Sequence, residues 1–160
     1  MNVLETLLTL AGAHAQTVLL EFKLCELSPT WLLVNADGHC SLIETPWRDD
    51  AQKELIWRQL RAAMAARNTV AYSFITEAWV AQLTPEQWNP DAGPLPEGLR
   101  PAKRADRQEV VLALAADKTS AQWRQWTIVR DHLEQIIRLD PRPFATGEQA
   151  PESWMTELLK

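Results

Sequence analysis

The sequence predicts an α+β domain, in which a mostly antiparallel sheet of about five strands has helices packed on it. Three observations predict this fold. Apolar residues recur at helical spacing through residues 3–25, strand-like segments dominate the middle of the chain, and Asp37-Gly38 marks a hairpin. The 160 residues are enough to bury one core, so we expect a single domain over residues 1–160. The expected element order is α-β-β-α-β-loop-β-β-α.

The first 45 residues predict a helix followed by a hairpin. Leucine and alanine residues in 3–25 recur at steps of three and four, which places them on one helix face. Gly12 weakens this helix by up to about 1 kcal/mol relative to alanine, so one long helix and two short ones both fit. Residues 31–34 and 41–44 are the expected hairpin strands, and Asp37-Gly38 between them suits a type I′ turn.

A second helix and a central strand are expected next. Thr45 is the expected N-cap and Pro46 the first helical residue, with the helix ending near Arg67. The expected buried stripe of this helix comprises Ile56, Leu60, Ala63 and Met64. Residues 69–80 form the strongest strand, and both of its faces are mainly apolar, so we expect a central strand covered on both sides.

Residues 84–106 interrupt the pattern of helices and strands. Five of the ten prolines lie there, which predicts a mobile, proline-rich loop inside the domain. The sheet is expected to resume at 109–114 and to return through 123–130. Residues 132–140 fit either a short helix or a further strand, and 151–159 predict a short C-terminal helix.

Charge and targeting signals narrow the class of protein. The formal net charge of −5 argues against nucleic-acid binding, which needs a basic face. No apolar run reaches the roughly 18 residues of a membrane span, and the N-terminus has no basic segment typical of a secretory signal. Cys25 and Cys40 are expected to be ordinary thiols. We therefore expect a cytoplasmic protein that binds neither membranes nor nucleic acid.

Few residues indicate a metal site, a nucleophile or a cofactor-binding loop. His14, His39 and His132 are dispersed, which argues against a zinc site. Cys40 adjoins His39, but neighbours on a strand point to opposite faces. The five glycines form no phosphate-binding loop. We therefore expect no metal and no cofactor.

Glu77 is the one catalytic candidate. It shares a face of the central strand with Ile75 and Trp79, so its ionised carboxylate needs a partner. Arg107 or Arg104 supplies an ion pair if strands 69–80 and 109–116 are neighbours. The other interpretation is a functional carboxylate beneath the 84–106 loop, because a desolvated glutamate can act as an acid or base.

The chain is rich in tryptophan, with eight Trp against one Tyr and three Phe. Trp79 and Trp88 flank the start of the proline-rich loop, whereas Trp123 and Trp126 have opposite parity on one strand, so at most one of these two faces the core. Core packing explains some of them. Contact with a partner, a second copy or a ligand explains any that are exposed, because tryptophan is enriched at interface hot spots.

Several short motifs carry a resemblance. They are Asp37-Gly38, Thr45-Pro46-Trp47, Phe74-Ile75-Thr76-Glu77-Ala78-Trp79 and Arg107-Gln108-Glu109-Val110. Over about residues 32–117 the chain resembles a group of small uncharacterised bacterial proteins with an FxxEAW strand followed by an RxEV strand. That group has no established activity, so the resemblance implies no catalytic residues and only directs attention to Glu77, Trp79, Arg107 and Glu109.

Two functions follow as hypotheses. The first is a non-enzymatic binding or homo-oligomeric assembly module that forms a homodimer or binds another protein. Its candidate binding residues are Glu77, Trp79, Trp88, Arg107, Trp123 and Trp126. The second is a small hydrolase-type enzyme that uses Glu77 beneath the 84–106 loop.

Overall fold

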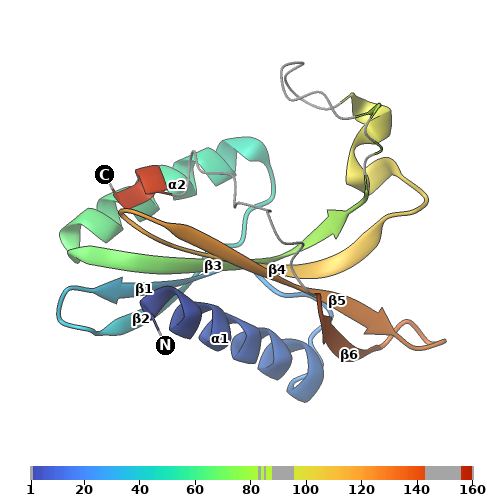
Figure 1. Cartoon of the computed structure of the whole chain (residues 1–160), viewed down its shortest axis with the longest axis horizontal. Helices are drawn as coiled ribbons and strands as arrows, with labels where there is room; N and C mark the ends of the chain where they lie inside the picture. The colour runs from blue at the N-terminus through green and yellow to red at the C-terminus, as the bar shows by residue number, and fades with distance from the viewer. Residues whose placement is uncertain (1, 83, 85, 88–95, 143–155, 160) are drawn as a thin grey trace.

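The computed structural model describes residues 2–82, 84, 86–87, 96–142 and 156–159. They form one curled six-stranded sheet in the order β2-β1-β3-β4-β5-β6, in which all neighbouring strands are antiparallel (Figure 1). The strands are β1 (Thr30–Asn35), β2 (Cys40–Glu44), β3 (Thr69–Val80), β4 (Gln108–Asp117), β5 (Ala121–Arg130) and β6 (Ile136–Pro141). Helices α1 (Val3–Gln16) and α2 (Asp50–Ala66) cover opposite faces of the sheet. The α+β class and the antiparallel sheet are confirmed.

The number of strands and the element order need correction. We expected about five strands, and the ambiguous segment 132–140 proves to contain a sixth, β6. A strand forms there because Leu139 pairs with Ile128 and both side chains are buried beneath α1. After β6 the described residues contain only the short 3₁₀ turn Thr156–Leu159, labelled η4, in place of the expected terminal helix. The rest of that predicted helix lies outside the described residues.

The N-terminal segment is one continuous helix. Asn2 and Glu5 form a capping box at its start, and α1 continues into a π-helical turn, η1 (Thr17–Glu21). Gly12 lies within α1 because the ring of Trp126 packs against it. A Cβ atom at position 12 would lie 2.7 Å from Cζ2 of Trp126, closer than carbon atoms approach each other.

By length and composition, the stretch Val3–Glu21 would also serve to span a membrane. One such helix is weak evidence, because a core helix of a soluble protein passes the same test. Here Leu4, Leu7 and Leu8 of α1 are buried in the core cluster on the sheet, whereas Leu10 is exposed.

The hairpin is confirmed, but its turn differs from the expected type. Asn35 N–H donates to His39 O at 3.0 Å, so three residues, and not two, lie between the last hydrogen-bonded pair of the hairpin. The Asn35 side chain accepts from the N–H groups of Asp37 and His39, and Gly38 adopts a φ of +83°. This is the three-residue hairpin loop that needs glycine in the left-handed region.

Helix α2 starts later than the sequence suggested. Asp49 is its N-cap, because Oδ1 of Asp49 accepts from Gln52 N–H at 2.8 Å. Thr45, the expected cap, instead accepts a hydrogen bond from the indole Nε1 of Trp31 at 2.9 Å in the buried core. Only Leu60 and Met64 of the helix are fully buried.

The two faces of the central strand carry separate cores, as expected. Ala71 and Ile75 of β3 join the cluster under α1, whereas Tyr72 and Phe74 join the cluster on the α2 side. The tryptophan surplus is explained largely by this second cluster, in which the Trp31 ring lies 4.4 Å from Phe74. Its other aromatic members include Trp47, Trp57, Tyr72 and Trp123.

The proline-rich loop is only partly described. It contains two short 3₁₀ turns, η2 (Glu97–Leu99) and η3 (Pro101–Lys103). Trp88, one of the predicted binding residues, lies outside the described residues.

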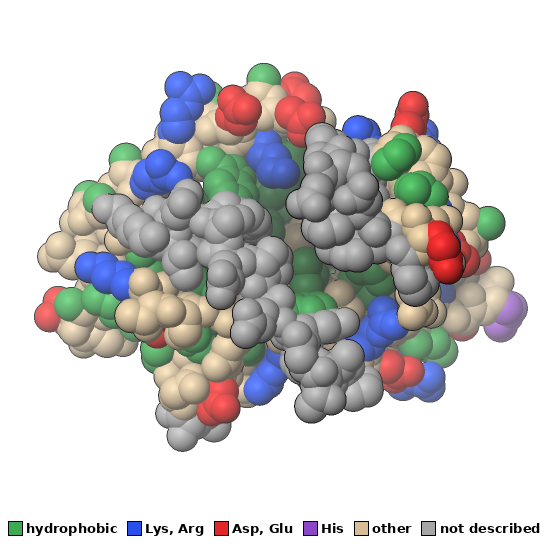
Figure 2. All heavy atoms as spheres, turned by 45° about the horizontal axis from the view of Figure 1, so that its top comes forward, with side chains coloured by type: hydrophobic (Ala, Val, Ile, Leu, Met, Phe, Trp, Pro, Cys, Tyr) green, Lys and Arg blue, Asp and Glu red, His purple; other side chains and the backbone are tan. Residues whose placement is uncertain are grey.

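Figure 2 shows acidic and basic side chains interspersed over the α2 side of the molecule, with hydrophobic side chains in a hollow between them.

Candidate functional site

Several of the singled-out residues meet at one end of the sheet, where β3 ends and β4 begins. Glu77 and Trp79 follow Ile75 at alternate positions of β3, which places them on the α1 face. Glu109 of β4 lies directly opposite Trp79 in the strand register. We call this region the sheet-end surface and define it by Glu77, Trp79, Arg107, Glu109 and Arg130.

The half-buried Glu77 carboxylate is bonded to the main chain. Its Oε1 accepts a hydrogen bond from Leu27 N–H at 2.7 Å, which fastens the connection between η1 and β1 to the central strand. Burial raises the pKa of Glu77, and the negative charges of Glu109 and Glu26 act in the same direction. The Leu27 N–H group and the Arg130 guanidinium oppose this rise in the pKa. Glu77 is therefore a carboxyl group whose proton is held more tightly than usual.

The prediction that Glu77 forms an ion pair with Arg104 or Arg107 is wrong. Arg104 instead forms a two-pronged pair with Asp106, with both nitrogen–oxygen distances at 2.7 Å. Arg107 donates to the carbonyl oxygen of Ala102. Both arginines therefore bond to residues close to them in the chain and not to Glu77.

The ion pair at the sheet end joins Glu109 and Arg130, across β4 and β5. Nε and Nη2 of Arg130 lie 2.8 and 2.7 Å from the two Glu109 carboxylate oxygens, and Nη1 donates to Glu134 O. This bidentate pair raises the pKa of Arg130. Sequence reasoning missed Arg130, although its parity with Trp126 on the last strand of the expected sheet was a usable signal.

Trp79 and Arg107 form an exposed stacked pair. The guanidinium carbon of Arg107 lies 4.4 Å from the Trp79 ring centre, within the range of a cation–π interaction. Trp79 is 43% exposed, although it lies on the central strand. A large aromatic side chain that remains this exposed offers contact area to another molecule.

The other two described tryptophan candidates are packing residues. Trp126 is buried beneath α1, and Trp123 is partly buried in the aromatic cluster on the opposite face. Their opposite parity is confirmed, but the expectation that at most one of them faces the core is wrong, because each face of the sheet carries its own hydrophobic cluster. Neither belongs to the sheet-end surface.

A pocket with both apolar and charged lining residues adjoins the sheet-end surface. It has a volume of about 480 Å³, and its lining includes Leu24, Cys25, Arg130, Glu134 and Ile136. Hydrophobic side chains are exposed along η1, β6 and the segments next to them, namely Phe22, Leu24, Leu133 and Ile137. The Arg130 side chain thus connects the charged end of the sheet to an apolar surface.

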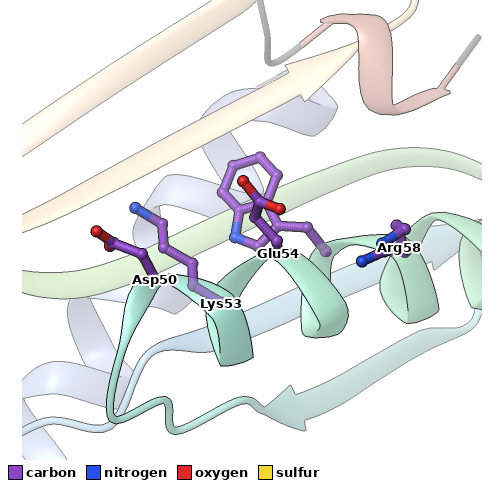
Figure 3. Close-up of a pocket in the computed structure, with 5 residues that line it drawn as sticks. Asp50, Lys53, Glu54 and Arg58 are labelled. Carbon is purple, nitrogen blue, oxygen red and sulfur yellow. The ribbon is translucent and has the colours of Figure 1, made fainter.

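A second pocket of about 570 Å³ runs along α2 and has mixed charges. Its described lining residues all come from α2, and Figure 3 shows acidic and basic side chains alternating there. They are Asp50, Lys53, Glu54, Trp57 and Arg58. Such alternation is typical of a solvated helix face and does not by itself select a ligand.

The structure also locates the histidine, cysteine and acidic side chains of the described residues. Within the described ranges, no group of three or more His, Cys, Asp or Glu side chains is placed to hold a metal ion. Cys25 and Cys40 are both exposed and free.

Comparison of the chain with family models, curated proteins and solved structures gives no match. The resemblance to small bacterial proteins therefore stays an expectation.

Proposed function

We propose that this chain is a non-enzymatic binding module that contacts another protein through the sheet-end surface. The observation that carries the proposal is the exposed Trp79 with Arg107 stacked on it. Tryptophan and arginine are the residue types most enriched at interface hot spots. Because the indole and the guanidinium already lie against each other, little side-chain entropy remains to be lost when they bind.

The surroundings of this pair support a protein partner. The Glu109–Arg130 ion pair forms a polar region beside Trp79, and the exposed hydrophobic residues around η1 and β6 extend the surface beyond it. An apolar area next to paired polar groups is typical of protein interfaces. The partner chemistry that fits is an apolar segment flanked by acidic residues, which face the free edge of the Arg107 guanidinium.

A small hydrolase-type enzyme that uses Glu77 is the second candidate. The raised pKa of Glu77 favours it, because general acids need a proton held near neutral pH. Against it, the carboxylate is bonded to Leu27 N–H at 2.7 Å, and this contact lies at the η1–β1 connection and not in the 84–106 loop. We therefore rank the binding module first.

Site-specific photocrosslinking in the cell of origin tests the binding proposal. A benzophenone amino acid is placed at Trp79, and the matched control places it at Leu55, which is about equally exposed on α2. We expect one defined crosslinked protein from position 79 and none from position 55. The captured protein is then purified, and we expect Trp79→Ala to weaken its binding at least 30-fold, the size of a hot-spot loss.

Two results contradict the proposal. One is an absence of any position-specific crosslink at Trp79. The other is a captured protein whose affinity is unchanged by both Trp79→Ala and Arg107→Ala, while the thermal stability of the variants matches that of the wild type.

A further inference from the structure

The two edges of the sheet differ in how they are protected. β6 carries the devices that stop an edge from pairing with another chain. Its register shifts opposite Val129 and Arg130, so Ile137 forms a bulge, and Pro141 ends the strand without an N–H group. Arg138 and Asp140 add a charged pair on this strand.

β2 is a five-residue strand with one charged residue, Glu44, but it has no bulge, no proline and no charged pair. It pairs with β1 in a continuous register from Glu44 to Cys40, without a bulge. Its sequence, Cys-Ser-Leu-Ile-Glu, contains no proline and no lysine. Leu42, at its centre, is 50% exposed.

The alternation of hydrogen bonds along the hairpin shows which main-chain N–H and C=O groups of β2 point away from β1. Asn35 N–H donates to His39 O, and Thr45 N–H donates to Pro29 O, so the bonds to β1 involve the odd-numbered residues on the β2 side. In an antiparallel pair the intervening residues point their N–H and C=O groups the other way. These are Cys40, Leu42 and Glu44, and no other described element supplies a main-chain bond to them.

We propose that β2 pairs with β2 of a second copy, antiparallel about a two-fold axis through Leu42. This register matches all three outward-facing residues: Leu42 lies opposite its own copy, and Cys40 lies opposite Glu44. A register centred on any other residue of β2 leaves outward groups unpaired. The two sheets become one continuous sheet through the dimer.

The side chains of β2 suit a second copy. In the proposed register Glu44 faces a neutral residue, so no like charges lie opposite each other. Leu42 is opposite Leu32 of β1 and therefore projects from the α1 face, where its copy in the partner covers it. This dimer uses a different surface from the sheet-end surface, so either proposal can fail without the other.

Light scattering on the full-length protein after size-exclusion chromatography tests the dimer. Leu42→Pro is the decisive variant, because the N–H group it removes faces outward and makes no bond to β1. Leu42→Lys provides a second variant in case the proline disturbs folding. Ile137→Lys, on the protected edge β6, is the matched control, since Ile137 is as exposed as Leu42.

We expect the wild type and Ile137→Lys to be dimers and both Leu42 variants to dissociate at least tenfold more readily. A wild-type monomer over the whole accessible concentration range overturns the proposal. So does a dimer that persists unchanged in both Leu42 variants.

Disulfide trapping then tests the register. In a C25S/C40S background, L42C places two thiols on residues about 5.5 Å apart between Cα atoms, within the range for a disulfide. The control E44C faces residue 40 of the partner and not its own copy. We expect L42C to form a covalent dimer on mild oxidation and E44C to remain monomeric on a denaturing gel. Equal trapping of the two variants contradicts the register.

Discussion

Replacing Gly12 by alanine tests how α1 is seated on the sheet. In an exposed helix position this change stabilises a protein by about 1 kcal/mol, because alanine loses less backbone entropy than glycine. At position 12 the new Cβ would lie 2.7 Å from Cζ2 and 3.2 Å from Cη2 of Trp126. Trp126 is only 9% exposed, so its ring cannot move away without displacing its neighbours.

The steric clash between the new Cβ and Trp126 costs more free energy than the higher helix propensity of alanine gains. Adding a methyl group to a packed core costs about 1–3 kcal/mol. Subtracting the gain of about 1 kcal/mol leaves a net loss of about 1 kcal/mol in the free energy of unfolding for Gly12→Ala. The control Ala13→Gly, at an exposed neighbouring position of the same helix, reports the propensity term alone.

Urea denaturation followed by circular dichroism measures both changes. In a Trp126→Leu background the clash is absent, and we expect Gly12→Ala to raise the midpoint of unfolding instead of lowering it. If Gly12→Ala instead stabilises the otherwise unchanged protein by the amount that Ala13→Gly destabilises it, the Trp126 ring does not resist the added methyl group.

Three further predictions concern buried polar groups. The pKa of Glu77 is raised, so the stability that its protonated form contributes is complete below its unfolded pKa and is lost as the pH rises through its folded pKa. We expect Glu77→Gln, which keeps an acceptor for Leu27 N–H, to be more stable than the wild type at neutral pH. This difference in stability should close towards pH 4. A difference that does not change with pH would contradict the raised pKa of Glu77. Thr45→Val removes the acceptor of the buried Trp31 indole and should cost about 1–3 kcal/mol in urea unfolding, whereas Thr45→Ser should cost much less. Ser73 is fully buried and its Oγ has no hydrogen-bond partner in the described structure, so Ser73→Ala should raise the thermal midpoint; a fall would reveal an undetected bond.

The parts of the fold that local patterns determine were predictable from the sequence. The alternation along residues 69–80 placed β3 with its bounds and its two buried faces, because a strand covered on both sides needs apolar residues at both parities. The hairpin followed from Asp37-Gly38 for a similar local reason. The sixth strand could not be predicted in this way. β6 is stabilised by its pairing with β5 and by the burial of Leu139 beneath α1, and the local sequence shows neither.

At the candidate site, too, local patterns were predictable and contacts between distant parts of the chain were not. Sequence reasoning placed Glu77 and Trp79 on one face and directed attention to Glu109 and Arg107. It paired Glu77 with the wrong group, because the Leu27 N–H donor comes from 50 residues away. Gly12 looked like a weakness of the first helix and proved to be the position where the Trp126 ring fits, since only the fold brings β5 against α1.

A native mass spectrum of the purified protein is the most direct test of the proposed homodimer. It reports the number of subunits and any bound small molecule together. We predict a homodimer with twice the chain mass and no added mass. A monomer that carries a stoichiometric small molecule or metal ion would contradict this account and move the candidate chemistry to Glu77.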